Sequence, residues 1–302
     1  MFDLLDLYLL RRAVPADDQT LRFRRIDGQA IANVIYFLPW HTPFALARQA
    51  GFMPLDFLAC YEMPPAIVSS RPELCARAMR GLVDDAQRCL LAARIPAKDA
   101  VIVGLSVGSF PATYLANRIG ARLCSVASAD RADLTIWQSR ATRIIKSRAV
   151  AKGLRLAHYS RALIGAHPAQ NLAAIAKESI FIIGRRDPFI PPLRSAGLLQ
   201  AIAALAPGAQ VITLDAGHFR TMMLSGRYQR AMLGLSAASV WSFAQEAMRE
   251  ARKLLNRRRP ELRPAPTPGP PSTAGTGSIP SVQRESPIFA RSIATVRRGS
   301  LG

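Results

Sequence analysis

The sequence contains no uninterrupted apolar run of the about 18 residues that a membrane-spanning helix needs. Acidic residues are scarce, since 20 Asp and Glu stand against 40 Lys and Arg. The opening segment Met1–Asp6 carries acids where a secretory signal would carry bases. We therefore expect a cytoplasmic protein, with peripheral contact to a membrane as a further possibility.

Cysteine is rare and shows no C-x-x-C pairing: the chain has Cys60, Cys75, Cys89 and Cys124. Thiols in apolar or helix-like stretches are usually reduced and packed or half-buried, which we expect here. The sequence shows no metal-ligand cluster and no phosphate-cradling glycine loop. The stretch 104–108 also lacks the third glycine of the dinucleotide fingerprint. We expect neither a metal nor a cofactor.

The net charge of +20 is spread along the whole chain. Residues 252–302 hold ten Lys and Arg against Glu261 and Glu285, and the remainder of the charge lies before them. Such a surface favours anionic partners, such as phosphate-bearing substrates, acidic carrier proteins, anionic lipid or nucleic acid. A compositional preference for arginine, with no partner at all, explains the charge equally well.

Short apolar runs alternate with helical patterns through most of the chain. Strands are predicted at 20–26, 31–38, 55–61, 100–104, 121–127, 179–184 and 210–214, and helices at 72–93, 109–118 and 237–255. The pair Asp27-Gly28 predicts a turn that leads the first strand into a hairpin. The alternation predicts an α/β fold with a mostly parallel, twisted sheet flanked by helices.

Changes in composition divide the chain into four parts. Residues 1–19 form an apolar helix that packs on the core or rests on a membrane surface, and residues 20–128 and 179–256 form the α/β core. Residues 129–178 show no clear strand and are interpreted as an inserted helical cap. Residues 257–302 are basic and rich in proline, so we expect a disordered tail that either is solvated or contacts an anionic membrane or polyanion.

The sequence Gly104-Leu105-Ser106-Val107-Gly108 follows the apolar run 100–103 and opens a helical stretch. A serine at such a strand–turn–helix bend is held clear of the backbone, where its hydroxyl can attack a carbonyl carbon. The hydroxyl is a weak nucleophile and needs a base, usually a histidine oriented by a carboxylate. Alternatively, Ser106 is a simple turn residue.

His218 and Asp187 are the candidates for these two roles. His218 lies in Leu214-Asp215-Ala216-Gly217-His218, just past one predicted strand, and Asp187 follows the preceding strand. Loops after the carboxyl ends of parallel strands gather at one edge of a sheet, so both side chains should meet Ser106 there. The alternatives are a helix N-cap role for Asp187, before Pro188, and a structural role for His218.

The order Ser, Asp, His, each just beyond a strand, resembles the α/β-hydrolase superfamily over about residues 20–255. The segment 184–191 looks like the acid loop of that family, and 216–219 looks like its histidine loop. The resemblance implies Ser106 as nucleophile, His218 as general acid and base, and Asp187 as its orienting carboxylate. Asp215 is the rival carboxylate, at a spacing that the family seldom uses.

The resemblance also implies an oxyanion hole that contains the backbone N–H of Val107. The second donor should come from the loop after the strand 31–38, where the family often has His-Gly and this chain has Leu38-Pro39-Trp40-His41. Because Pro39 has no N–H, Trp40 is the candidate and His41 the reserve.

These expectations together predict a serine hydrolase that cleaves a carboxylic ester or thioester through an acyl-enzyme on Ser106. The cap mixes apolar residues with arginines and lysines, which suits a substrate that is apolar at one end and anionic at the other. An acyltransferase that uses the same three residues is one alternative. A non-catalytic binding protein on a hydrolase fold is the other.

Overall fold

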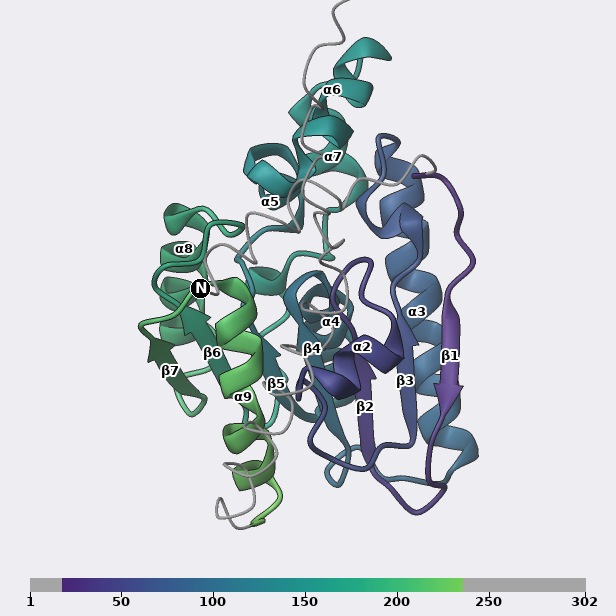
Figure 1. Cartoon of the computed structure of the whole chain (residues 1–302), viewed down its shortest axis with the longest axis vertical. Coiled ribbons are helices and arrows are strands. Elements are labelled where there is room, and N and C mark those ends of the chain that lie inside the picture. Colours follow the sequence, from purple (N-terminus) through teal and green to yellow (C-terminus); the bar gives the residue numbers. More distant parts are fainter. Residues whose placement is uncertain (1–17, 236–302) are drawn as a thin grey trace, which may run out of the picture. The chain divides into compact units, whose positions relative to one another are not determined.

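The computed structural model describes residues 18–235 of the chain (Figure 1). The predicted apolar helix at the N-terminus, the helix 237–255 and the proline-rich tail lie outside the described residues, apart from positions 18 and 19. Within residues 18–235, no helix has the length and apolar character needed to cross a membrane.

The described residues form one seven-stranded sheet in the order β1-β3-β2-β4-β5-β6-β7. Its strands are β1 (Arg24–Asp27), β2 (Val34–Phe37), β3 (Ala59–Glu62), β4 (Val101–Leu105), β5 (Arg122–Val126), β6 (Ile180–Gly184) and β7 (Gln210–Leu214). Only the pair β1–β3 is antiparallel, and every other neighbouring pair is parallel. This confirms the predicted mostly parallel sheet.

One predicted connection is wrong. Asp27-Gly28 does not turn β1 into a hairpin, because β3 lies between β1 and β2 in the sheet. The N–H of Gly28 donates to the carbonyl of Leu58, and a Cβ on Gly28 would lie 2.0 Å from the carbonyl oxygen of Phe57. The turn therefore packs against the start of β3, and this tertiary contact outweighs the local hairpin signal.

Helices cover both faces of the sheet (Figure 1). On one face lie α3 (Pro72–Ala92), α4 (Ser109–Ile119) and α8 (Pro192–Leu205), and on the other lie α2 (Phe44–Gln49) and α9 (His218–Met232). In α3, Ala78, Leu82, Ala86 and Leu90 lie four residues apart on one face and are buried, and Leu74 on the same face is partly buried. Pro72 opens this helix, where its missing N–H costs nothing.

The central strands read as continuous apolar runs because both of their faces are covered. Along β4, Val101, Val103 and Leu105 pack toward α2 and α9, whereas Ile102 packs toward α3 and α4. Strands of parallel sheets show this burial on both sides. The cysteines are free, with Cys89 half-buried and the other three buried, as expected for reduced thiols.

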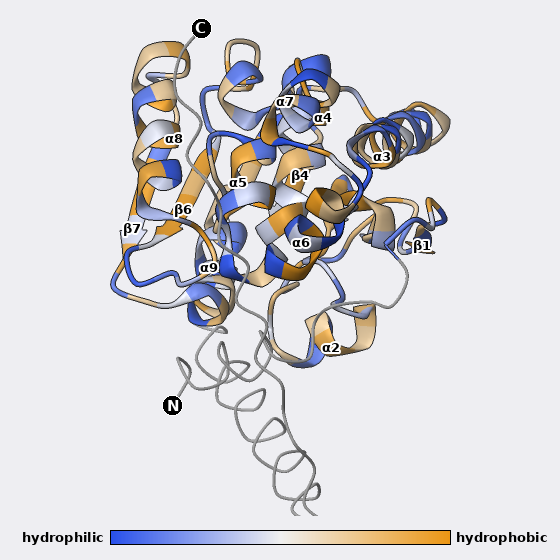
Figure 2. Cartoon of the chain, turned by 90° about the horizontal axis from the view of Figure 1, so that it is seen from above, coloured by the Kyte–Doolittle hydropathy of each residue, from blue (hydrophilic) through white to orange (hydrophobic). Residues whose placement is uncertain are grey.

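Between β5 and β6 the chain forms three short helices, α5 (Ala132–Gln138), α6 (Arg143–Ala151) and α7 (Leu156–Ala162). They lie beyond the carboxyl ends of the parallel strands (Figure 1), and α6 carries both hydrophilic and hydrophobic residues (Figure 2). Two hydrogen bonds, both 2.6 Å long, join this region to the segment before α3. Tyr159 Oη of α7 donates to the carbonyl of Ser69, and Lys152 Nζ, just after α6, donates to Ser70 Oγ.

Candidate active site

Ser106 lies at a sharp turn between β4 and α4. The strand ends at Leu105, a 3₁₀ turn spans Ser106–Gly108, and α4 begins at Ser109. The backbone of Ser106 has φ +55°, a conformation that a non-glycine residue rarely adopts. Strain of this kind, roughly 1–3 kcal/mol, persists where the surrounding structure enforces it and is common at functional sites. The half-buried serine is thereby lifted out of the strand and helix.

The two glycines around Ser106 make this turn possible. A Cβ on Gly104 would lie 2.5 Å from both Ala112 Cβ and Ser109 Cα. A Cβ on Gly108 would lie 2.3 Å from the carbonyl oxygen of Phe37, at the end of β2. Any larger residue would therefore push the turn away from α4 or from β2. The glycine spacing in the sequence thus reflects close packing on both sides of the serine.

The structure brings the three predicted residues together. His218 Nε2 lies 2.7 Å from Ser106 Oγ, and His218 Nδ1 lies 2.6 Å from Asp187 Oδ2. Asp187 follows β6, and His218 is the first residue of α9, just after β7. A carboxylate only accepts hydrogen bonds, so Nδ1 of the neutral ring carries the proton and Nε2 accepts one from the serine hydroxyl.

The carboxylate of Asp187 is held from both sides. Its second oxygen, Oδ1, accepts hydrogen bonds from the backbone N–H groups of Phe189 (2.8 Å) and Ile190 (3.0 Å). The side chains of His218 and Asp187 are only 4% and 3% exposed. Because the carboxylate is shielded from water and its Oδ1 is held by two backbone donors, Oδ2 is oriented toward the imidazole. The helix-cap alternative for Asp187 is wrong, because α8 starts five residues later and is preceded by Pro191.

Asp215, the rival carboxylate, lies elsewhere. Its side chain is about half exposed and pairs with Arg186 at 2.6 Å and with Arg185 at 3.6 Å. These arginines belong to the same loop as Asp187, but their guanidinium groups form ion pairs with Asp215 instead. Within residues 18–235, no three His, Cys, Asp or Glu side chains are grouped as a metal site would require.

The two predicted oxyanion donors lie on segments that touch each other. Val107 directly follows Ser106 at the start of the helical turn. Trp40 lies in the turn after β2, which is closed by a hydrogen bond from the N–H of Thr42 to the carbonyl of Pro39. The contact of Gly108 with the carbonyls of Phe37 and Leu38 places the start of this loop against the serine turn. His41, the reserve donor, has φ +54°, and its ring is tilted against that of Trp40 with the centroids 4.3 Å apart.

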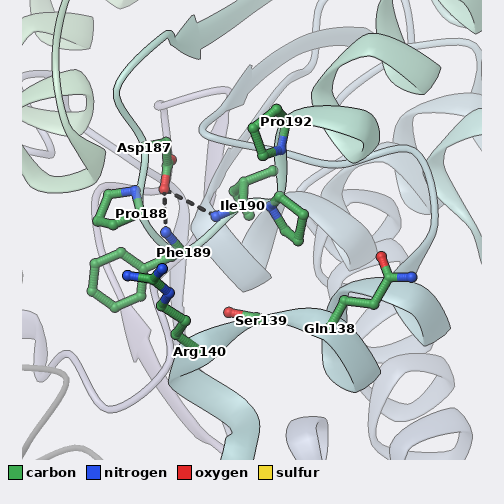
Figure 3. Close-up of a pocket in the computed structure, with 9 residues that line it drawn as sticks. Gln138, Ser139, Arg140, Asp187, Pro188, Phe189, Ile190 and Pro192 are labelled. Atoms are coloured by element: carbon green, nitrogen blue, oxygen red, sulfur yellow. Dashed lines mark hydrogen bonds between the residues drawn. The ribbon is translucent and has the colours of Figure 1, made fainter.

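Sequence reasoning did not single out Phe189, whose ring centroid lies 4.7 Å from that of His218. Phe189 also forms one wall of a pocket of about 330 Å³ beside Asp187 (Figure 3). We call it the acid-side pocket; its lining consists of Gln138, Ser139, Arg140 and residues 187–192. The pocket joins the loop after β6 to the end of α5, two segments that no local sequence pattern connects.

No protein-family model matches the sequence, and neither does any curated protein. Solved structures do match. The enol-lactonase of Burkholderia xenovorans LB400 is 19% identical, with a TM-score of 0.41, over 74% of this chain and 96% of the lactonase. TT1662 of Thermus thermophilus is 19% identical, with a TM-score of 0.45, over 70% of this chain and 92% of that protein. The Pyrococcus furiosus esterase Pf2001 is 12% identical, with a TM-score of 0.41, over 70% of this chain and 90% of the esterase.

The fold is identified by the chain's own geometry. A mostly parallel sheet carries a strained serine turn at the end of a central strand, flanked by two closely packed glycines. An aspartate and a histidine follow in that order along the chain, each after a later strand, and both reach the serine site. This chain therefore has the α/β-hydrolase fold.

Proposed function

We propose that this protein is a serine hydrolase that cleaves a carboxylic ester or thioester through an acyl-enzyme on Ser106. The observation that carries the proposal is the continuous hydrogen-bonded line from Ser106 Oγ through the imidazole of His218 to Asp187. Such a line allows the ring to take a proton from an alcohol while a fixed carboxylate stabilises the resulting imidazolium.

In the first half of the reaction, Ser106 Oγ attacks the carbonyl carbon of the substrate and His218 Nε2 accepts the hydroxyl proton. The tetrahedral intermediate then expels the alcohol or thiol, which receives that proton from the imidazolium. Asp187 keeps the ring oriented throughout, because its other oxygen accepts hydrogen bonds from two backbone N–H groups. The acyl group is left as an ester of Ser106.

The negative oxygen of the tetrahedral intermediate needs donors that are in place before the reaction. We assign this role to the backbone N–H groups of Val107 and Trp40. The N–H of Val107 stands at the start of a helix, where the backbone dipoles favour a developing negative charge. The packing of the loop after β2 on the serine turn supports the choice of Trp40 as the second donor.

In the second half, a water molecule attacks the acyl-enzyme while His218 accepts one of its protons. The serine oxygen leaves, takes the proton back and restores the resting site. A carboxylic acid is released. Transfer to an alcohol or thiol would follow the same steps, with the acceptor in place of water.

The proposal is tested by hydrolysis of p-nitrophenyl esters of graded acyl length, alongside acyl-CoA thioesters. We expect turnover that Ser106→Ala lowers by at least about 10³-fold, because the nucleophile is lost. Ser147→Ala is the matched control, since Ser147 is an exposed serine of α6 that bonds only within its own helix. Equal turnover by both variants would refute the proposal.

A further inference from the structure

The acid-side pocket lies one aromatic ring away from the catalytic imidazole. Phe189 is a wall of the pocket on one side and contacts His218 on the other. The ring of Phe189 is therefore shared by the pocket and the histidine of the proposed catalytic site. The pocket volume of about 330 Å³ is at the small end for ligand sites, which suits a group of a few heavy atoms.

Arg140 provides the only basic side chain that lines the acid-side pocket. Its side chain extends from the turn after α5 toward the loop 187–192 (Figure 3). Among the described residues, its guanidinium forms no ion pair, whereas Arg131, Arg186 and Arg194 each have a carboxylate partner. The charge of Arg140 is thus available to a ligand.

The remaining polar groups of the pocket also suit an anion. Ser139 accepts a hydrogen bond from the N–H of Ala141, which leaves its hydroxyl proton for another acceptor. Gln138 adds an exposed side-chain amide. Asp187 is the sole carboxylate of the lining, and both of its oxygens are already bonded to His218 and to backbone donors. Neither oxygen of Asp187 is therefore left without a donor.

We propose that the acid-side pocket binds an anionic group, a carboxylate or phosphate, carried by the substrate and paired with Arg140. This inference rests on the proposed function. The walls made by Pro188, Phe189 and Ile190 accommodate a short apolar linker between the cleaved carbonyl and the anion. A guanidinium can bind either anion through two parallel N–H donors, which a lysine cannot reproduce. The substrate class is thus a small ester or thioester with an acidic end.

The test compares two p-nitrophenyl esters of equal length, the glutarate monoester with a free carboxylate and the neutral hexanoate. We expect Arg140→Ala to lower the ratio of kcat/KM values, anionic over neutral, by about tenfold, as expected for loss of a charge-assisted hydrogen bond at a partly exposed site. Arg140→Lys should give an intermediate ratio. Arg161→Ala, which removes an exposed arginine of α7 outside the pocket, should keep the wild-type ratio.

A second readout does not depend on turnover. Calorimetric titration of the Ser106→Ala protein with glutarate and with glycerol 3-phosphate should show binding that Arg140→Ala weakens by about tenfold and that added salt also weakens. The tighter of the two ligands identifies the anion. If Arg140→Ala and Arg161→Ala bind and discriminate equally, the inference is overturned. Binding that depends on Arg140, in a protein that cleaves no ester, would refute the proposed function instead.

Discussion

The hydroxyl of Ser109 donates a 2.5 Å hydrogen bond to the backbone carbonyl of Ser106, the residue at the strained turn. Ser109 has one hydroxyl proton, so its contact with Ser128 Oγ at 2.8 Å uses the proton of Ser128. Both serines are buried. The hydroxyls of Ser109 and Ser128 thus link the carbonyl of Ser106, the proposed nucleophile, to α4 and to the loop after β5.

Ser109→Ala should therefore loosen the turn. We expect kcat to fall roughly tenfold and the free energy of unfolding to fall by about 1 kcal/mol, because the carbonyl of Ser106 loses a buried donor. Ser125→Ala is the control, since Ser125 is a buried serine whose hydroxyl has no partner among the described residues. Kinetics and urea unfolding should show Ser125→Ala to be neutral or stabilising. Equal losses in the two variants would contradict a positioning role for Ser109.

Asp187→Asn should lower kcat by about 10⁴-fold with little change in stability, because an amide at this position favours the wrong tautomer of His218. Asp215→Asn should change kcat less than twofold, since Asp215 pairs with arginines on the surface. Steady-state kinetics on one ester distinguishes the two carboxylates. A larger effect at Asp215 would mean that the acid has been misassigned.

Gly108→Ala should give a protein that folds poorly or loses activity, because the new Cβ would press on backbone oxygens of Phe37 and Leu38 that cannot move independently. Gly81→Ala is the matched control. Gly81 lies within α3, and the nearest atom to its added Cβ would be Phe23 Cε1 at 3.9 Å. There alanine should stabilise by roughly 0.5–1 kcal/mol, through helix propensity. Thermal unfolding with circular dichroism checks both.

The segment 132–167 is held together by the buried carboxylate of Asp133. Burial opposes its charge, but hydrogen bonds from Arg131 and Ser160 outweigh burial and keep the pKa of Asp133 below its usual value. Because this pKa is lower in the folded than in the unfolded protein, the ionised carboxylate stabilises the fold at pH values above the unfolded-state pKa. This contribution disappears as the pH falls through the lowered pKa. Asp133→Asn should thus cost about 1–2 kcal/mol at neutral pH and much less near pH 3.

Urea unfolding of the wild type and of Asp133→Asn at the two pH values measures this difference directly. Asp84→Asn is the control, because Asp84 pairs with Arg118 on the surface and should contribute under about 0.5 kcal/mol. A loss at Asp133 that stays constant between the two pH values would mean that its ionised form is not what stabilises the segment.

Much of the site was predictable because chain order and sheet geometry determine it together. Ser106, Asp187 and His218 each follow a strand of the parallel part of the sheet, and parallel strands bring such positions to one edge. The pairing of β1 with β3 was not predictable, because Asp27-Gly28 gives a local turn signal and the decisive contact is with Phe57, distant in sequence. The meeting of Phe189 with His218 and of Arg140 with the acid-side pocket likewise depends on tertiary packing without a sequence pattern.

The most direct test of the account is covalent labelling with a fluorophosphonate, followed by peptide mapping of the adduct by mass spectrometry. A fluorophosphonate reacts with a serine that is activated by a neighbouring base. We predict one adduct, on Ser106, that forms in the wild type and in Ser147→Ala but is absent in Ser106→Ala. A folded wild-type protein that stays unlabelled, or an adduct that maps to another serine, would contradict it.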